Sequence, residues 1–401
     1  MNLYHSTRSR AISRTSMEAI REGLAPDGGL YVCDALGSEK VEVAGLAEQS
    51  YHDIARAVLQ LLLPDYTADE IAACVCEAYD GTFASPEVTP LLPLGTAPKG
   101  MTKGTGVGRN EAHECDSFDP GSVLDLFHGP TSAFKDVALQ MLPRLMARAN
   151  SGAAPASGSG AASTAERVMI VTATSGDTGK AALEGFRDVA GTKILVFYPK
   201  DGVSDIQKLQ MVTQEGRNVG VCAVRGNFDD AQTGVKRIFS DAQLRETLAS
   251  RGYFLSSANS INWGRVLPQI VYYVSSYCDL LASGAIEEGQ TVNVCVPTGN
   301  FGNILSGFYA KKMGVPIGRL ICASNENNVL TDFIRTGTYD RNRPFYQTAS
   351  PSMDILISSN LERLLYLLSG SDEEVRGYMQ ALAGTGRYSV SERVFRGVQA
   401  E

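Results

Sequence analysis

Apolar and polar positions follow two different periods in the second half of this chain. From residue 167 onward, short apolar runs alternate with stretches in which apolar residues recur every three or four positions. Short apolar runs predict buried strands, and the longer period predicts amphipathic helices. The strands are expected at 168–173, 193–198, 218–224, 292–296 and 319–323. Strands that alternate with helices are typical of a mostly parallel, helix-covered sheet, so the pattern predicts an α/β fold.

The first part of the chain is patterned differently. Residues 48–63 and 67–79 have helical periodicity, which predicts an N-terminal module over residues 1–95. Two later segments, 99–121 and 150–165, are rich in glycine and in charged or small residues. Because such compositions offer little to bury, both are predicted to be mobile surface insertions.

Two of the predicted strands run into glycine-rich turns. The turns read Thr174-Ser175-Gly176-Asp177-Thr178-Gly179-Lys180 and Pro297-Thr298-Gly299-Asn300-Phe301-Gly302-Asn303. Helical patterns follow each turn, at 181–190 and 304–313. A strand, a glycine turn and a helix N-terminus together favour an anion site, because backbone N–H groups converge where no Cβ intervenes. The alternative is that these glycines only permit tight turns.

Neither turn matches a nucleotide-binding motif. A phosphate-binding loop of the Walker type requires Gly-Lys followed by Ser or Thr, whereas Gly179-Lys180 is followed by Ala181. The position five before Gly179 is Thr174 instead of glycine, and neither turn spells Gly-x-Gly-x-x-Gly. These two classes of nucleotide site are therefore excluded.

A lysine at the start of a predicted helix is the candidate reactive group. Residues 128–136 read His-Gly-Pro-Thr-Ser-Ala-Phe-Lys-Asp, with Thr131 or Ser132 as the expected helix cap. The apolar residues that follow recur on one helical face, at Val137, Met141, Leu142 and Leu145. Lys135 is then expected in the first turn, where the helix dipole disfavours an ammonium and a neutral amine can form a Schiff base. The alternative for Lys135 is a solvated surface lysine.

Four motifs together resemble a known family. They lie at 129–136, 172–179, 257–265 and 297–303, and the openings 3–8 and 23–32 agree with them. In this order they resemble threonine synthase of the bacterial and fungal type. The resemblance implies a pyridoxal 5′-phosphate enzyme of fold type II, which is tryptophan synthase β-like. It also implies a domain division, with a large cofactor-binding domain at 96–165 and 285–401 and a smaller α/β domain at 166–284.

The resemblance also implies roles for individual residues. Lys135 would form the Schiff base with the cofactor and would act as the catalytic base. The other cofactor contacts would be Phe134, Ser175, Gly176, Asp177 and the phosphate loop Thr298, Gly299, Asn300, Phe301, Gly302 and Asn303. The substrate contacts would be Thr178, Ser260, Asn262 and Arg265. The segment 203–216, which includes Gln207, resembles a family helix that faces the substrate, and its alternative is a solvated amphipathic helix.

The implied reaction converts O-phospho-L-homoserine and water to L-threonine and phosphate. Two alternatives remain: a related phospho-lyase that gives 2-oxobutyrate, and a non-catalytic cofactor-binding remnant. The remnant is motivated by the end of the chain. Relatives are expected to continue into a Ser/Thr-x-His-Pro-Ala-Lys-like segment whose hydroxyl lies near the pyridine nitrogen, and this sequence stops at Glu401 before such a segment.

Composition narrows the setting. The net charge is −8 and the basic residues are dispersed, which argues against binding to nucleic acid or to a membrane surface. No apolar run approaches the roughly 18 residues that span a bilayer, and the first ten residues are too polar for a signal peptide. A cytoplasmic protein is expected. The eight cysteines form no Cys-x-x-Cys pair, so no metal site is predicted and buried free thiols are expected. The oligomeric state is not predictable from this pattern.

Overall fold

A computed structural model gives the fold of the chain. It describes residues 4–34, 36–94, 121–151, 167–174, 176–226 and 228–401. The two predicted insertions therefore lie almost entirely outside the described residues, and Ser175 lies outside them as well.

The N-terminal part combines a small antiparallel sheet with helices. The sheet has the order β2-β1-β3, with β1 at Tyr4–Ser6, β2 at Ser9–Arg14 and β3 at Tyr31–Cys33. The helices are α1 (Ser16–Glu22), α2 (Val43–Leu46), α3 (Tyr51–Leu62) and α4 (Ala68–Tyr79). The helices α3 and α4 confirm the two predicted in this part of the chain. A further antiparallel pair joins β4 (Leu91–Pro93) to β5 (Ser122–Leu124).

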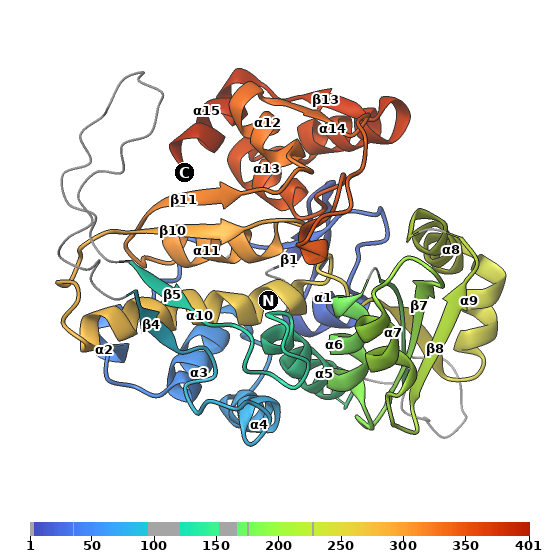
Figure 1. The fold of residues 1–401 in the computed structure, drawn as a ribbon, viewed down its shortest axis with the longest axis horizontal. Helices are drawn as coiled ribbons and strands as arrows, with labels where there is room; N and C mark the ends of the chain where they lie inside the picture. Colours follow the sequence, from blue (N-terminus) through green and yellow to red (C-terminus); the bar gives the residue numbers. More distant parts are fainter. Residues whose placement is uncertain (1–3, 35, 95–120, 152–166, 175, 227) are drawn as a thin grey trace, which may run out of the picture.

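A four-stranded parallel sheet forms one side of the molecule (Figure 1). Its order is β8-β7-β6-β9, from β6 (Arg167–Ala173), β7 (Thr192–Pro199), β8 (Val219–Val224) and β9 (Tyr253–Ser256). The associated helices are α6 (Asp177–Phe186), α7 (Asp205–Val212), α8 (Phe228–Ser240) and α9 (Ala242–Ala249). Alternate residues of β6 face opposite sides, because side chains alternate along a strand. Val168 and Ile170 join the main core with α6, whereas Val171 and Ala173 join a second cluster with α8.

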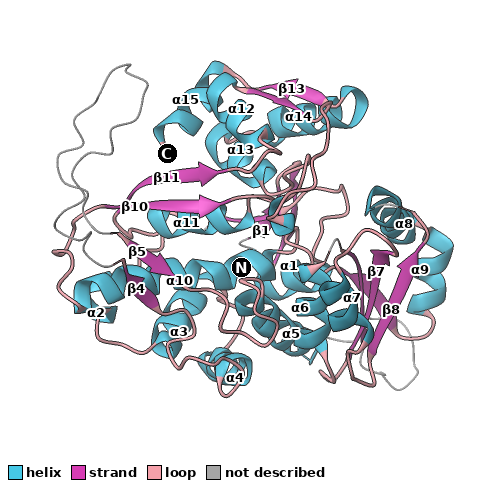
Figure 2. Ribbon diagram, in the orientation of Figure 1, coloured by secondary structure: helices cyan, strands magenta, loops and turns pink. Residues whose placement is uncertain are grey.

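The rest of the chain surrounds a second, two-stranded parallel sheet. It pairs β10 (Val292–Pro297) with β11 (Ile317–Ala323). The helix α11 (Gly302–Lys312) packs against both strands, α10 (Trp263–Ala282) packs on α11, and α5 (Asp136–Ser151) packs on α10. The C-terminal elements are α12 (Val329–Thr336), β12 (Thr338–Asp340), η1 (Pro351–Met353), α13 (Leu361–Ser369), α14 (Asp372–Thr385), β13 (Arg387–Ser389) and α15 (Glu392–Ala400), and β12 pairs with β13. Figure 2 shows helices on both sides of the larger sheet and beside the smaller one.

All five strands predicted from residue 167 onward are present, as β6, β7, β8, β10 and β11. The short strand β9 was not predicted. Its run is only four residues long and ends in Ser256, so it lacks the run of five to seven residues that predicted the others. The predicted α/β class with parallel strands is confirmed.

The main core lies around α10. Trp263 packs between Tyr4 and Tyr309, with ring centroids 5.6 and 5.1 Å away, and its indole N–H donates to the Tyr4 hydroxyl at 2.9 Å. This core joins residues of the N-terminal sheet, α5, α6 and α11 in one hydrophobic cluster. Because one cluster crosses all the predicted domain boundaries, the domain division stays a prediction.

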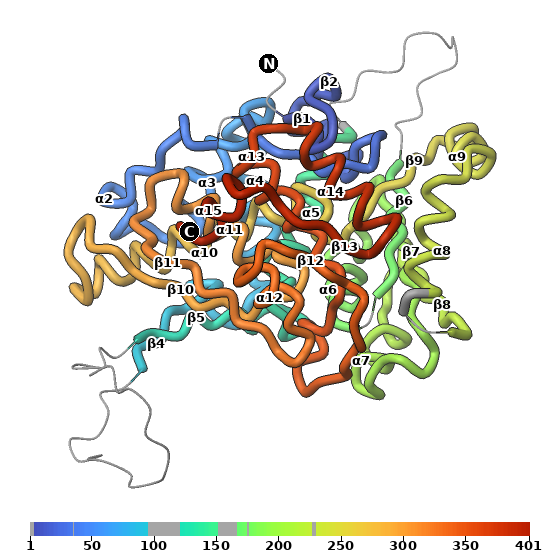
Figure 3. The backbone as a smooth tube through the Cα atoms, turned by 90° about the horizontal axis from the view of Figure 1, so that it is seen from above, coloured from blue at the N-terminus to red at the C-terminus, as the bar shows by residue number. Residues whose placement is uncertain are grey.

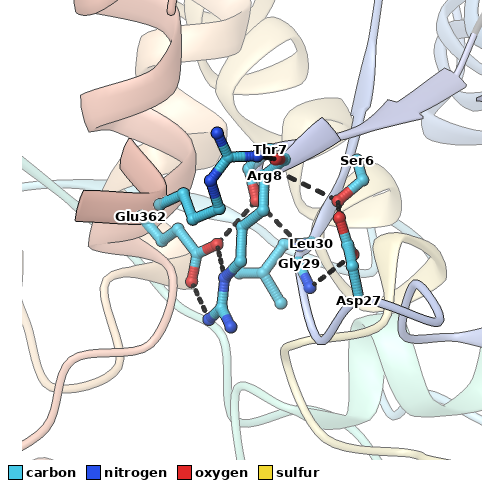
Figure 4. Close-up of polar contacts among 8 residues, drawn as sticks. Ser6, Thr7, Arg8, Asp27, Gly29, Leu30 and Glu362 are labelled. Carbon is cyan, nitrogen blue, oxygen red and sulfur yellow. Dashed lines mark hydrogen bonds and ion pairs between the residues drawn. The ribbon is translucent and has the colours of Figure 1, made fainter. Parts of the chain in front are cut away.

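Polar contacts tie the N-terminal strands to α13 (Figure 4). The Thr7 hydroxyl donates to Glu362 at 2.6 Å and accepts the backbone N–H of Leu30 at 2.9 Å. The Arg8 guanidinium donates to both oxygens of Glu362, at 2.8 Å each. The Ser6 hydroxyl adds a bond to Asp27 at 2.8 Å. A bidentate pair with a buried carboxylate fixes direction as well as distance, so α13 is held against the N-terminal sheet.

Candidate active site

Lys135 lies at the point where the chain enters α5. Its carbonyl accepts the first helical hydrogen bond, from the Leu139 N–H at 2.9 Å, so it immediately precedes the helix. The expectation that it belongs to the first turn is wrong by one position. The residue is 8% exposed, so the solvated alternative is excluded. Burial lowers the pKa of the Lys135 ammonium; Asp177 opposes this shift and Arg265 adds to it.

The start of α5 is held by an acid instead of the expected hydroxyl cap. The buried Asp136 carboxylate accepts the Thr131 N–H at 2.8 Å and the Thr131 hydroxyl at 2.6 Å. Ser132 has a positive φ of 56°. Phe134 lies under the lysine, with its ring centroid 4.9 Å from the Lys135 Nζ. The tight turn therefore directs the amine into the protein.

The first glycine turn is held by its own threonine. The Thr174 hydroxyl, on a residue that is 2% exposed, accepts the N–H groups of Gly176 at 3.0 Å and Gly179 at 2.9 Å. Gly176 has a φ of 148°, a conformation that a side chain would strain. The helix α6 then begins at Asp177, so an acid occupies its first turn.

Asp177 connects three elements of the site. Its Oδ2 lies 3.5 Å from the Lys135 Nζ and accepts the hydroxyl of Ser352. Its Oδ1 accepts the side-chain amide of Gln207 at 2.7 Å. The carboxylate is thus shared between α5, α7 and η1, and it is the counter-ion of the lysine.

The second glycine turn leaves a helix end open. The first hydrogen bond of α11 runs from the Leu305 N–H to the Phe301 carbonyl at 3.0 Å. The N–H groups of Gly302, Asn303 and Ile304 therefore have no acceptor within the helix, and no side chain caps it. Phe301 has a φ of 63° and starts the helix in the left-handed region. Such an end is suited to bind an anion.

Residues far along the chain hold this second turn. The Ser358 hydroxyl donates to the Gly299 carbonyl at 2.7 Å. Asn360 donates to the Asn300 carbonyl from its backbone at 3.1 Å and from its side chain at 3.0 Å. A Cβ added to Gly299 would lie 3.2 Å from the backbone of Met353. Since Met353 directly follows Ser352, the η1 segment touches both glycine turns.

Arg265 brings a buried positive charge to the same region. It is 3% exposed and donates to the Ala258 carbonyl at 2.6 Å, whereas its Nε has no partner among the described residues. Burial lowers its pKa to about 10. A buried guanidinium with a free donor favours an anionic ligand, because an unpaired buried donor is costly.

The other two residues of this segment differ in what their side chains contact. The Ser260 hydroxyl accepts the side-chain amide of Asn360 at 3.0 Å and keeps its own proton for a further partner. Asn262 is fully buried; its amide donates to the carbonyls of Ile20 and Ser257, and its oxygen accepts the Gly264 N–H. These contacts favour a structural role for Asn262 as the cap of α10. Its predicted role in substrate binding is not supported by them and stays a prediction.

The described residues suit a phosphate-bearing aldehyde. The uncapped start of α11 offers N–H donors for a phosphate, and the buried amine of Lys135 is placed to bond covalently to an aldehyde. Thr178 is half-buried in the first turn of α6, and Ser175 lies outside the described residues. The assignment of ligand contacts to single residues therefore stays a prediction.

Sequence reasoning missed several residues of this arrangement. Ser352, Ser358 and Asn360 come from a segment without strand or helix periodicity, so nothing local marked them. Gln207 was noted only through its helix, which was expected to face the substrate. In the structure its amide contacts Asp177.

The sequence matches two family descriptions. Residues 3–79 match the description "Threonine synthase N terminus", and residues 123–392 match "Pyridoxal-phosphate dependent enzyme". Threonine synthase of Saccharomyces cerevisiae is 36% identical over all of this chain and 74% of its own length. The chain belongs to the threonine synthase family.

Two further comparisons give the range of this family. Threonine synthase-like 1 of Homo sapiens is 42% identical over 89% of this chain but only 45% of its own length, so the chain spans less than half of that relative. The structure titled PLP-bound threonine synthase from Brucella melitensis superposes with a TM-score of 0.84 at 38% identity, covering 100% of this chain and 77% of that chain. Membership in the threonine synthase family confirms the predicted fold type II and pyridoxal 5′-phosphate as the family's cofactor.

Three further predictions concern membrane-spanning helices, metal sites and cysteine thiols. None of the helices in the described residues is long and apolar enough to cross a membrane. The described residues hold no group of three or more His, Cys, Asp or Glu that could bind a metal ion. None of the seven cysteines described forms a disulfide, but Cys222 and Cys295 are exposed, so the expectation of buried thiols is wrong for these two.

Proposed function

We propose that this chain is a threonine synthase that converts O-phospho-L-homoserine and water to L-threonine and phosphate with pyridoxal 5′-phosphate. The observation that carries the proposal is the buried Lys135 amine, which lies 3.5 Å from Asp177 near the buried cation Arg265. Members of the threonine synthase family from yeast and Pseudomonas aeruginosa, at 36% and 38% identity, support the substrate assignment.

The open end of α11 would hold the cofactor phosphate, and Lys135 would bond to the cofactor aldehyde. The N–H groups of Gly302, Asn303 and Ile304 supply donors that α11 itself does not use. The side chain of Asn303 is held by two tyrosines of α10, because its oxygen accepts the hydroxyls of Tyr272 at 2.6 Å and Tyr273 at 2.8 Å. When bound, the cofactor supplies an electron sink for electron pairs released at the substrate's carbon atoms.

Lys135 would move the protons of the reaction. A general base works best when its pKa is near the working pH, and burial together with Arg265 lowers the pKa of Lys135 in that direction. Its Nζ would take the α proton and then a β proton from the substrate. Asp177, 3.5 Å away, would hold the ammonium formed after each proton is taken. The phosphate leaves from the γ carbon, and water adds at the β carbon. Nζ would pass on the α proton before it takes the β proton, and two protons return to the substrate, one at the γ carbon and one at the α carbon.

Arg265 and Ser260 would bind the phosphate group of the substrate. The Arg265 Nε has no partner among the described residues, and the Ser260 hydroxyl, which accepts from Asn360, can still donate its proton. A guanidinium is well suited to phosphate, because it forms paired hydrogen bonds and stays charged. Asn262 would not contact the substrate; it would hold Arg265 in place by capping α10, the helix that carries this arginine.

The test is to measure phosphate and threonine in one reaction of the full chain with O-phospho-L-homoserine and added pyridoxal 5′-phosphate. Equal amounts of the two products are expected. Phosphate accompanied by 2-oxobutyrate in place of threonine would replace the proposal with the phospho-lyase. A chain that binds the cofactor but releases no phosphate would support a non-catalytic remnant and overturn the proposal.

A further inference from the structure

Gln207 lies outside the residues assigned so far, yet its side chain reaches into the site. It is the third residue of α7, whose first turn is closed by Ser204. The backbone N–H of Gln207 donates to the Ser204 hydroxyl, and the Gln207 side-chain oxygen accepts the Ser204 backbone N–H, both at 3.2 Å. This reciprocal cap fixes the side chain at the helix start.

The cap also determines which end of the amide faces Asp177. The side-chain oxygen of Gln207 must point to the Ser204 N–H, because only an oxygen can accept that bond. The amide nitrogen then points to the Asp177 Oδ1, at 2.7 Å. The amide oxygen can accept from Ser204 but could not donate to Asp177, and the amide nitrogen can donate to Asp177 but could not accept from Ser204.

The glycine turn makes room for this contact. A Cβ added to Gly176 would lie 2.3 to 2.5 Å from three atoms of the Gln207 side chain. No real Cβ tolerates so short a distance, so the absence of a side chain at Gly176 lets Gln207 approach Asp177.

The contact leaves the other carboxylate oxygen for the lysine. The Asp177 Oδ1 is bound by Gln207, while Oδ2 accepts Ser352 and lies 3.5 Å from the Lys135 Nζ. The charged groups that act on Lys135 are Asp177 from α6, Arg265 from α10 and its neighbour Asp136. Among them, only Asp177 is held by an amide from α7.

We propose that Gln207 is a positioning residue, which holds the Asp177 carboxylate in the orientation that turns one oxygen to Lys135. The proposal deepens the function given above and rests on it only where turnover is concerned. Gln207 touches neither the lysine nor any reacting atom in the contacts described. Its effect on the reaction is exerted through Asp177.

Two substitutions separate this role from a merely structural one. Gln207→Leu removes the amide, so the carboxylate turns more freely and meets Lys135 for less of the time. Gln207→Glu keeps an oxygen for the Ser204 cap but places a second negative charge beside Asp177. The lysine should therefore lose its proton at lower pH in Gln207→Leu and at higher pH in Gln207→Glu, each by roughly half a pH unit or more.

The measurement is acetylation of Lys135 by acetic anhydride as a function of pH, read by mass spectrometry on the cofactor-free chain. The visible absorbance of the cofactor-loaded chain gives a second titration, that of the proton on the nitrogen that would join Lys135 to the cofactor. Two control variants are Ser204→Ala and Gln210→Leu. Ser204→Ala removes the hydroxyl but keeps the backbone N–H that the Gln207 side chain binds, and Gln210→Leu makes the same change one turn along α7. Both should titrate like the unchanged chain.

Opposite shifts in the two Gln207 variants would support the proposal. Equal midpoints in the unchanged chain and in both variants, or shifts in the same direction, would overturn it. The labelling does not depend on turnover, so this result is separate from the fate of the threonine synthase assignment. If Gln207→Leu fails to fold, Gln207→Asn replaces it, because its shorter amide no longer reaches Asp177 and should shift the titration in the same direction.

Discussion

The two glycine turns share one local plan but are held in different ways. Each follows a parallel strand and starts a helix, α6 or α11. Thr174, two residues before Gly176, braces the first turn from within. The second turn is braced by Ser358 and Asn360, which lie about 60 positions further along the chain. One turn is therefore a local structure, whereas the other depends on the folded C-terminal part. Figure 3 shows the chain from above, with the C-terminal elements crossing over the middle of the molecule.

The turns also differ in charge. The first turn of α6 contains Asp177, whereas the first turn of α11 contains no acid. An acid in the first turn of a helix weakens the attraction of that helix end for a second anion, even where, as in α6, its side chain does not cap the helix. The same backbone arrangement therefore yields a partner for the Lys135 ammonium in one case and an open anion site in the other. The sequence alone favoured an anion site at both.

The largest loss of turnover is expected from replacing Lys135, the residue whose amine lies beside the first turn and would bond to the cofactor held by the second. Replacing Lys135 with alanine removes the amine that faces Asp177 and should lower turnover about 10³-fold or more. It should also abolish the visible absorbance of cofactor bonded to lysine. Lys180→Ala is the matched control, because this lysine of the first turn pairs with Glu184 instead. A Lys135→Ala chain that kept both absorbance and turnover would contradict the assignment.

The next change gives the second turn the acid of the first. Asn300→Asp places a carboxylate where the cofactor phosphate is proposed to bind, and like charges in such a site cost several kcal/mol. Pyridoxal 5′-phosphate should then bind about 100-fold more weakly in equilibrium titration. Asn300→Ser, which is neutral, should bind close to normally. Unchanged affinity in Asn300→Asp would mean that the phosphate lies elsewhere.

The converse change removes the acid from the first turn. Asp177 raises the pKa of Lys135 against the effect of burial, so Asp177→Asn should lower that pKa. A lower pKa leaves the amine neutral at lower pH. The acid limb of kcat, which reports groups of the substrate complex in which Lys135 is released from the cofactor, should therefore move toward lower pH. An unmoved limb would show that the ion pair does not control this titration.

The smallest effects concern the braces, and they should differ between the turns. Thr174→Val leaves the Gly176 N–H without its acceptor and leaves the Gly179 N–H only the Gly176 carbonyl, at 3.0 Å. The change should lower the free energy of unfolding by about 1–3 kcal/mol. Ser358→Ala removes one donor to the Gly299 carbonyl and should cost about 1 kcal/mol. Urea unfolding measures both.

The matched control for the first brace is Thr174→Ser, which keeps the hydroxyl and should lose little stability. Ser358→Ala should weaken cofactor binding as well, because it loosens the turn proposed to hold the phosphate. If Ser358→Ala lowered the free energy of unfolding more than Thr174→Val, the brace from the C-terminal part would be the stronger of the two, and the expected order of the braces would be reversed.

The sequence by itself determined the features that depend on near neighbours. The strands β6, β7, β8, β10 and β11 were predictable because an apolar run of five to seven residues marks a buried strand wherever it lies. Lys135 and both glycine turns were predictable because helix starts and tight turns need particular residues at adjacent positions. The order of the four motifs along the chain was enough to show the resemblance to the threonine synthase family.

The tertiary structure alone decided which partners each of these groups has. Gln207 and Ser352 reach Asp177 from 30 and 175 positions away, and Asn262 turns its amide to Ile20, 242 positions away. Contacts at such separations leave no period or spacing in the sequence, because they arise only when distant elements pack together. For the same reason, the difference between the two glycine turns, one holding a carboxylate against a lysine and one left open, appears only in the folded chain.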